Sequence, residues 1–229
     1  MKLSGKKILV IGASRGIGET IAKSLLEEKA KVIASSRNNI NYDCEFINLD
    51  INDQNSIKSL KKYLMLKHKF LNGIVVTAGI SLPPTVNVNK SNKNLLQDPL
   101  IFKKLISTNL IGVYECIYCL ENLLEENSSI VLISSIGAHL AFPYNTGYQV
   151  SKAGLESMAR SISYELGSRN IRANTIVLGY FKTKMTIQSF NDNKLRKERE
   201  EKTILNRWGE KSEITGAVKL LLSDDSSYI

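Results

Sequence analysis

The sequence is poor in cysteine, and the few cysteines that it has argue against two kinds of protein. Three cysteines among 229 residues give no sign of the disulfide framework of an exported protein. Cys116 and Cys119 form a C-x-x-C pair inside an apolar helical pattern, and Cys44 is the only further cysteine, so a metal site would lack ligands. We interpret all three as structural thiols and expect no metal.

The sequence also lacks a long apolar run and a targeting segment. No run approaches the roughly 20 apolar residues that span a bilayer, so we expect no membrane segment. The apolar stretch near the amino terminus leads into glycines and has no small-residue cleavage site. That pattern is typical of a strand and not of a signal peptide, and we expect a cytoplasmic protein.

Basic residues are in excess, with a formal net charge of +9. Such a balance can indicate a nucleic-acid partner. The basic residues are spread along the chain, however, and are often mixed with acids, as in residues 193–202, and no nucleic-acid motif is present. We therefore expect no nucleic acid, and an anionic cofactor or substrate would use the positive field equally well.

Short apolar runs alternate with helical patterns along the whole chain. The runs are apolar on both alternations, as expected for strands buried on both faces, and they lie at residues 6–12, 31–35, 45–49, 73–79, 129–135 and 171–179. Helical patterns lie at residues 15–29, 52–68, 93–127, 148–168 and 210–224. The alternation predicts an α/β fold, a doubly wound parallel sheet of Rossmann type with helices on both faces, in one domain over residues 1–229.

Two segments interrupt this alternation. Residues 80–94 carry two adjacent prolines and many asparagines, and residues 180–209 show no strand pattern and are typical of mobile helical pieces. Both follow a predicted strand end, where ligands bind in open α/β sheets. We therefore expect both segments to line a substrate site, although a simple surface loop remains an alternative for each.

A glycine-rich turn follows the first predicted strand and opens the first predicted helix. Gly12, Gly16 and Gly18 permit a tight turn and a close approach of a pyrophosphate to the helix start, where main-chain N–H groups and the helix dipole favour anions. The spacing is G-x-x-x-G-x-G and not the commoner G-x-G-x-x-G. Its place between a strand and a helix favours a dinucleotide.

The end of the second predicted strand bears on the choice of dinucleotide. An acidic residue there would bind the ribose 2′-hydroxyl of NAD, whereas an arginine accommodates the 2′-phosphate of NADP. The chain has Arg37 at this point and no acid before Asp43, and Arg15 adds a second cation within the glycine turn. The pattern favours NADP.

Tyr148 and Lys152 are four residues apart at the start of a predicted helix, so they share one face. An ammonium beside a phenol favours the phenolate, and we expect it to lower the tyrosine pKa toward neutrality, where the group exchanges a proton usefully. A solvated pair on a helix surface is the alternative that the spacing alone leaves open.

Five motifs in order resemble those of the short-chain dehydrogenase/reductase family, in the branch of the β-ketoacyl carrier-protein reductases. They are GASRGIG at residues 12–18, NLDIND at 48–53, STNLIG at 107–112, LISSIG at 132–137 and YQVSK at 148–152. The resemblance covers almost the whole chain, and it implies an NAD(P)-binding oxidoreductase.

The resemblance implies a role for each residue of a catalytic set. Tyr148 donates its proton to the substrate oxygen, Lys152 lowers the tyrosine pKa and holds the nicotinamide ribose, and Ser135 hydrogen-bonds the carbonyl oxygen. Asn109 would hold a water that connects Lys152 to solvent. Ser135 precedes Tyr148 by thirteen residues, the usual spacing in the family.

The resemblance also implies a cofactor set, with Asp50 and Ile51 near adenine and Thr183 near the nicotinamide amide. The full set is Gly12, Ser14, Arg15, Gly16, Ile17, Gly18, Arg37, Asp50, Ile51, Ala78, Gly79, Tyr148, Lys152, Gly179, Phe181 and Thr183.

The chain departs from the family pattern at three places. Val76-Thr77-Ala78-Gly79 replaces N-N-A-G, so the asparagine that braces the sheet in the family is missing and the local rigidity is open to question. Leu178-Gly179 replaces P-G. The sequence ends at Ile229, where relatives continue through a last strand, so a carboxyl-terminal strand is expected to be missing or truncated. A homodimer or homotetramer is expected.

The resemblance implies an NADPH-dependent carbonyl reductase, most simply a 3-oxoacyl-carrier-protein reductase. Another small ketone, sugar or alcohol is the alternative substrate, and a non-catalytic NADP(H) sensor is the alternative class. An acidic carrier protein would dock on basic groups such as Arg169 and Arg172, whereas Glu125 and Glu126 would oppose it. The substrate is accordingly a small-molecule or acyl-thioester carbonyl compound.

Overall fold

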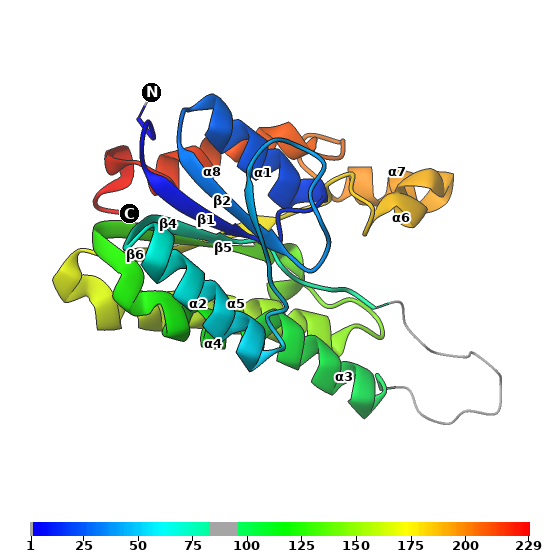
Figure 1. Ribbon diagram of the computed structural model, residues 1–229. Coiled ribbons are helices and arrows are strands. Elements are labelled where there is room, and N and C mark those ends of the chain that lie inside the picture. Colours follow the sequence, from blue (N-terminus) through cyan, green and yellow to red (C-terminus); the bar gives the residue numbers. More distant parts are fainter. Residues whose placement is uncertain (1, 83–95) are drawn as a thin grey trace.

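A computed structural model describes residues 2–82 and 96–229 and shows one parallel sheet in the strand order β3-β2-β1-β4-β5-β6 (Figure 1). The strands are β1 (Lys7–Ile11), β2 (Lys31–Ser36), β3 (Glu45–Asn48), β4 (Leu71–Val76), β5 (Leu124–Ser135) and β6 (Arg172–Leu178). The order reverses between β1 and β4, so the predicted doubly wound fold is confirmed.

Helices cover both faces of the sheet (Figure 1). On one face lie α1 (Gly16–Glu27) and α8 (Thr215–Leu222), and on the other lie α2 (Gln54–Lys67), α4 (Gly112–Leu120) and α5 (Thr146–Leu166). The remaining helical elements are α3 (Pro99–Ile106), η1 (Ser107–Ile111), η2 (Glu121–Leu123), η3 (Ile136–Ala138), η4 (Gly167–Arg169), α6 (Ile187–Asn191), α7 (Asn193–Glu201), η5 (Lys211–Ile214) and η6 (Asp224–Ser226). None of the helices within residues 2–82 and 96–229 is both long and apolar enough to cross a membrane.

Strand β1 shows why the predicted strands are apolar on both alternations. Leu9 and Ile11 pack into the core beneath α2, α4 and α5, whereas Ile8 and Val10 pack into the core beneath α1 and α8. All four side chains are buried. Because helices cover each face of the sheet, β1 buries apolar area on both of its sides, and burial of this kind stabilises a fold by about 25 cal/mol per Å².

The helix predicted over residues 93–127 is wrong in its extent. Asp98 caps α3 by accepting from the Leu100 N–H at 2.7 Å, with Pro99 at the first helical position. A π-helical turn, η1, then separates α3 from α4, and β5 already begins at Leu124. Asn127 adopts φ of 64° where the pairing of β4 with β5 shifts register, so the last residues of the predicted helix belong to an irregular strand start.

Residues 180–209 form an arm that projects beyond the sheet, where α6 and α7 lie in Figure 1. A parallel bridge between Phe181 and Gly209 closes its base. The single tryptophan, Trp208, lies buried against Phe190, whose ring meets it edge-on at a centroid distance of 5.4 Å. The segment therefore has a small aromatic core of its own. The prediction of helical pieces did not include this core.

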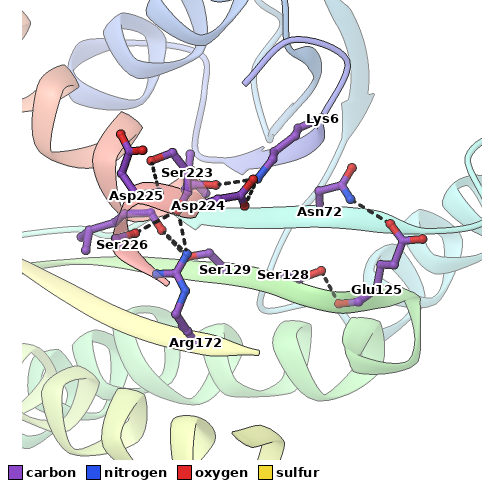
Figure 2. A network of polar contacts seen from close by, with 12 residues as sticks. Lys6, Asn72, Glu125, Ser128, Ser129, Arg172, Ser223, Asp224, Asp225 and Ser226 are labelled. Carbon is purple, nitrogen blue, oxygen red and sulfur yellow. Dashed lines mark hydrogen bonds and ion pairs between the residues drawn. The ribbon is translucent and has the colours of Figure 1, made fainter. Parts of the chain in front are cut away.

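The opposite, amino-terminal edge of the sheet carries a polar network (Figure 2). Arg172 donates to the carbonyl oxygens of Leu221 at 2.9 Å and Ser223 at 3.2 Å, and Lys6 pairs with Asp224 at 2.6 Å. These cations satisfy the carboxyl end of α8, where the helix dipole is negative. The network fixes α8 to β1 and β6, far from the strand ends that hold the predicted site.

Candidate active site

The predicted site residues gather at the carboxyl edge of the sheet, because all the paired strands run in parallel. The glycine turn follows β1, Arg37 follows β2, Asp50 and Ile51 follow β3, Ala78 and Gly79 follow β4, and Gly179 follows β6. Ser135 is the last residue of β5. Helix α5 brings Tyr148 and Lys152 to the same edge, and the turn η1 brings Asn109 there.

The first β–α turn is held by close main-chain packing. Gly12 adopts φ of 95°, and a Cβ added to it would lie 2.6 Å from the Ala78 nitrogen. A Cβ added to Gly18 would lie 2.2 Å from the Gly12 carbonyl oxygen. Any side chain at either position would push α1 away from β1 and β4, so the glycines set how closely the helix start approaches the sheet.

The outer side of the same turn is open. Gly16 adopts φ of 62°, and nothing lies within 4 Å of a Cβ added to it. Arg15, at the amino-terminal cap of α1, makes no side-chain capping bond to the helix, and its side chain is exposed, as is that of Arg37. Uncapped N–H groups, an open backbone and two cations fit the phosphates of a dinucleotide. Ser14 and Ile17 are half-buried in this turn.

Thr77 braces the sheet in place of the missing asparagine. Its hydroxyl donates to the carbonyl oxygens of Ile11 at 3.0 Å and Gly12 at 3.1 Å, and the Ala78 N–H donates to Ile11 at 3.0 Å. Thr77 therefore ties the end of β4 to the glycine turn, at the place where the family pattern has an asparagine. The strand predicted to reach Gly79 ends at Val76, because the chain turns here to make these bonds.

Asp50 and Ile51 connect β3 to α2. The Asp50 carboxylate accepts from the Asn52 N–H at 2.9 Å, and Asn52 donates in turn to the Thr108 hydroxyl at 3.1 Å. Ile51 is buried, and its carbonyl would lie 2.4 Å from a Cβ added to Gly112. This corner is thus packed directly onto η1 and α4.

Tyr148 and Ser135 lie side by side at the end of β5. A Cβ added to Gly137 would lie 3.4 Å from Tyr148 Cε1 and 3.5 Å from Ser135 Oγ. Burial raises the pKa of Tyr148 above its usual value, and the Ser135 hydroxyl beside it opposes that rise only in part. The expected fall of the tyrosine pKa is therefore wrong for this structure.

Lys152 is buried one helical turn beyond Tyr148. Its ammonium donates to the Ile133 carbonyl oxygen at 2.8 Å, and it lies 5.8 Å from the centre of the Tyr148 ring. Burial lowers the pKa of Lys152 to about 8. The structure confirms that the two residues share a face of α5, but the charge is held by the main chain of β5 and not by the phenol.

Asn109 lies fully buried in the π-helical turn η1. Its carbonyl oxygen accepts from the Ile80 N–H at 2.8 Å, and its amide donates to the Ile80 carbonyl at 2.9 Å and to Ser151 at 3.2 Å. A Cβ added to Gly79 would lie 3.4 Å from both Asn109 Oδ1 and Lys152 Nζ. Asn109 thus fixes the chain after β4 against α5. The water that Asn109 is expected to hold stays a prediction.

The predicted contacts after β6 lie at the base of the arm. Gly179 is exposed, and the Phe181 ring packs on Gly209, where an added Cβ would lie 2.8 Å from Phe181 Cε1. Thr183 and Thr186 share a hydrogen bond of 3.1 Å between their hydroxyls within one turn. Of the predicted wall at residues 80–94, residues 83–94 lie outside the described residues.

Sequence reasoning missed several polar side chains around Tyr148 and Lys152. Gln149 bonds to Phe142 of the loop before α5, and Glu156 bonds to Ser134 and His139. Glu156 stands four residues after Lys152, so the same helical spacing that selected Tyr148 and Lys152 could have found it. Gln149, next to Tyr148, had no periodic signal.

The cysteines agree with the structural interpretation. Cys116 is buried in α4, where burial raises the pKa of its thiol to about 12, and Cys44 and Cys119 are half-buried. Within the two described stretches of the chain, no group of three or more His, Cys, Asp and Glu side chains could hold a metal ion.

A family model described as Enoyl-(Acyl carrier protein) reductase matches residues 12–229. Among curated relatives, the 3-oxoacyl-[acyl-carrier-protein] reductase FabG of Chlamydia trachomatis is 31% identical over 99% of this chain and 94% of its own length. The FabG of Thermotoga maritima is 28% identical over 100% of this chain and 95% of its own length. The L-xylulose reductase of Caenorhabditis elegans is 29% identical over 97% of this chain and 90% of its own length.

Solved structures agree along the whole chain. A short chain dehydrogenase family protein from Francisella tularensis superposes with a TM-score of 0.86 at 27% identity, covering 99% of this chain and 94% of that one. The Pseudomonas aeruginosa RhlG/NADP active-site complex superposes with a TM-score of 0.87 at 25% identity, covering 100% and 93%. The fold is thus shared with both along the whole chain.

Proposed function

Because the chain belongs to the short-chain dehydrogenase/reductase family of oxidoreductases, we propose that it reduces a carbonyl group to an alcohol with NADPH as the reductant. One observation carries the proposal. Ser135 and Tyr148 lie together at the carboxyl end of β5, with buried Lys152 one helical turn further on. Two hydroxyl donors beside a buried amine suit a substrate oxygen that gains negative charge.

Tyr148 is the proton donor in this scheme. Burial keeps its pKa above the usual value, so the phenol is protonated at neutral pH, the form that reduction requires. An alkoxide is a stronger base than a phenolate, so the proton moves to the product oxygen even from a weakened acid. NADPH, when bound, supplies the hydride.

Ser135 and Lys152 prepare the site for that transfer. Ser135 Oγ accepts from the Gly137 N–H at 3.1 Å, which leaves the hydroxyl hydrogen free to donate to a substrate oxygen. Lys152 provides positive charge in a water-poor region, where it stabilises developing negative charge more than it would in water. Lys152 lies beside Gly79 and Asn109, a position from which its ammonium could bind the nicotinamide ribose.

The choice of NADPH rests on the cations at the cofactor turn. Arg15 and Arg37 are both exposed at the carboxyl edge, and no acid follows β2 before Asp43. A guanidinium group binds a phosphate with paired, charge-assisted hydrogen bonds. The relative solved as an NADP active-site complex supports the same choice.

For the substrate we propose a 3-oxoacyl thioester, because several curated relatives are 3-oxoacyl-[acyl-carrier-protein] reductases. Arg169 and Arg172 do not add to this case. Both guanidinium groups already donate to main-chain carbonyls, Arg169 to Leu124 and Arg172 to Leu221. A small ketose is the second candidate, because a relative at 29% identity is an L-xylulose reductase.

We propose a homodimer or homotetramer. Two shallow grooves lie along α4 and α5, lined among others by Tyr114, Tyr118, Met158 and Ile162. Tyr114 and Tyr118 are exposed there, and their rings stack at a centroid distance of 6.3 Å. Neither groove contains Ser135 or Tyr148, so this apolar face suits a second copy and not the substrate.

A panel of oxo compounds tests the function. The purified protein is mixed with NADPH and, in turn, a 3-oxoacyl thioester, a ketose, a simple ketone and a 2-enoyl thioester, and NADPH absorbance is followed. We expect oxidation with the 3-oxoacyl thioester and none with the enoyl thioester. Turnover of the enoyl compound alone, or NADPH binding with no turnover of any compound, would refute the proposed reaction, and the second result would favour a sensor.

A further inference from the structure

The loop of residues 136–145, between β5 and α5, lies against the catalytic tyrosine. A Cβ added to Gly137 in this loop would touch Tyr148 Cε1 at 3.4 Å and Phe142 Cε2 at 3.5 Å. The loop therefore forms one wall of the space beside the phenol. Its position sets the room that a substrate has next to Ser135 and Tyr148.

This loop has few apolar contacts to hold it. Leu140 is 50% exposed and Tyr144 is 36% exposed, and His139 and Ala141 are exposed as well. A segment that buries little apolar area gains little from the hydrophobic effect and opens easily unless polar bonds fix it. The side chains that bond to the loop therefore decide how fixed the wall is.

Gln149 bonds to both main-chain groups of Phe142. Its side-chain oxygen accepts from the Phe142 N–H at 3.2 Å, and its side-chain nitrogen donates to the Phe142 carbonyl at 2.8 Å. Gln149 is the neighbour of Tyr148 on α5, so the residue that fixes the wall and the residue that donates the proton belong to the same helical turn.

Glu156 makes a second connection, two helical turns beyond Tyr148. Its carboxylate accepts from the Ser134 hydroxyl at 2.9 Å and lies 3.1 Å from His139 Nε2. Ser134 is buried and precedes Ser135, whereas His139 belongs to the loop and its side chain is 58% exposed. Glu156 thus joins the end of β5, the loop and α5 at one carboxylate.

At the far end of the loop, Gln97 repeats the arrangement from the segment before α3. Its oxygen accepts from the Gly147 N–H at 2.7 Å, and its nitrogen donates to the Tyr144 carbonyl at 3.2 Å. The loop is therefore anchored along its length, and two of the anchors, Gln149 and Glu156, come from the helix that carries Tyr148 and Lys152.

We propose that Gln149 and Glu156 are positioning residues for the substrate: they hold the loop of residues 136–145 fixed beside Tyr148 and so orient the carbonyl toward Ser135 and Tyr148. The inference rests on the proposed function for its kinetic consequence, but not for the loop contacts themselves. Gln149 is the stronger anchor. Its two bonds are made by a half-buried side chain, whereas the His139 contact of Glu156 is exposed and screened by solvent.

A kinetic experiment compares Gln149→Ala, Gln149→Glu, His139→Ala and His139→Gln with the wild type. Loss of both Gln149 bonds should lower kcat/KM for the carbonyl substrate by about ten-fold, mainly through KM, while the Kd of NADPH stays within about two-fold. Gln149→Glu keeps one bond and should lose less, and His139→Gln should restore most of the smaller loss in His139→Ala. Gln54→Ala, an exposed glutamine on α2, is the matched control and should be unchanged.

The same variants are then compared by hydrogen–deuterium exchange, which does not depend on activity. In Gln149→Ala the Phe142 amide and its loop neighbours should exchange faster, with the α5 amides from Lys152 onward unaffected. Unchanged exchange in the loop would overturn the inference, and so would equal losses of affinity for NADPH and for the carbonyl substrate. If Gln149→Ala unfolds as a whole, the His139 variants decide, and activity in His139→Gln that is no higher than in His139→Ala would overturn the inference. If the wild type turns over no carbonyl, the proposed function fails, and the exchange result alone decides the role of Gln149.

Discussion

The Lys152 ammonium donates a 2.8 Å hydrogen bond to the Ile133 carbonyl oxygen, two residues before the serine that ends β5. Burial lowers the pKa of this lysine to about 8, so the group is a cation below that pH and neutral above it. Positive charge at the site stabilises the oxygen that gains negative charge. We therefore expect kcat/KM for carbonyl reduction to fall as pH rises through about 8, measured from about pH 6 to about pH 10.

Two variants separate this lysine from other titrating groups. Lys152→Arg keeps its charge across the range, so any activity that it retains should not fall near pH 8. Lys152→Met should have low activity throughout. A wild-type profile that is flat through pH 8 would show that the charge of Lys152 does not limit the reaction.

Replacement of Tyr148 by phenylalanine removes the proton donor and little else. We expect turnover to fall by about 10²- to 10⁴-fold, the usual contribution of a positioned general acid, with the Kd of NADPH nearly unchanged. Tyr164→Phe is the matched control, because Tyr164 lies on the same helix and is 89% exposed. Full activity in Tyr148→Phe would assign the proton to another group.

The fold was largely predictable because its signals are local. Buried parallel strands appear in the sequence as short runs that are apolar on both alternations, and β1 shows why, since Ile8 and Leu9 face different cores. The gathering of Ser135 and the glycine turn at one edge followed from parallel pairing alone. The order of the strands was not in the pattern, because it depends on contacts between distant segments.

The parts of the site that escaped prediction depend on such distant contacts. The Thr77 hydroxyl bonds to the carbonyl oxygens of Ile11 at the end of β1 and of Gly12 in the glycine turn, whereas the family pattern indicated only that the asparagine is missing. The fall expected in the Tyr148 pKa assumed an ammonium beside the phenol, but the main chain of β5 holds that ammonium. Burial, which sequence spacing does not give, then decides the direction of the shift.

Arg37 is the residue that should distinguish NADPH from NADH. A charge-assisted contact to a phosphate contributes about 1.5–3 kcal/mol, so Arg37→Ala should weaken NADPH binding by about ten-fold or more. NADH lacks that phosphate, and its Kd should change by less than about two-fold. Fluorescence titration of both cofactors measures this, with the exposed Arg160→Ala as a control for lost surface charge. Equal losses of affinity for both cofactors would show that Arg37 does not bind the 2′-phosphate.

The carboxylate of Glu45, on the edge strand β3, should make the free energy of unfolding depend on pH. Burial alone would raise its pKa, but hydrogen bonds from His68 at 2.7 Å, Tyr63 at 2.8 Å and Lys67 outweigh burial and hold the pKa below its usual value. The folded pKa is thus below the unfolded one of about 4.3, so the stabilisation is complete above that pH and is lost as pH falls through the folded value.

Glu45→Gln should therefore melt at a lower temperature than the wild type at pH 7, and the two melting temperatures should converge as the pH falls through the lowered folded pKa of Glu45, where the wild-type carboxylate becomes protonated. Thermal melts across this range test the point, with Glu27→Gln as the control because Glu27 is exposed on α1. A difference in melting temperature that stays constant with pH would mean that the ionisation of Glu45 is not its cause.

Thr77 offers a test of how the sheet supports the cofactor turn. Thr77→Val keeps the shape of the side chain but removes the hydroxyl that bonds Ile11 and Gly12, at a cost of about 1 kcal/mol in the free energy of unfolding. The Gly12 main chain then loses a constraint at the point where α1 begins, so the Kd of NADPH should rise several-fold. Thr77→Ser retains the hydroxyl and should keep most of the affinity. If valine and serine bind NADPH equally well, the turn is fixed by glycine packing alone, and the hydroxyl does not take over the part of the missing asparagine.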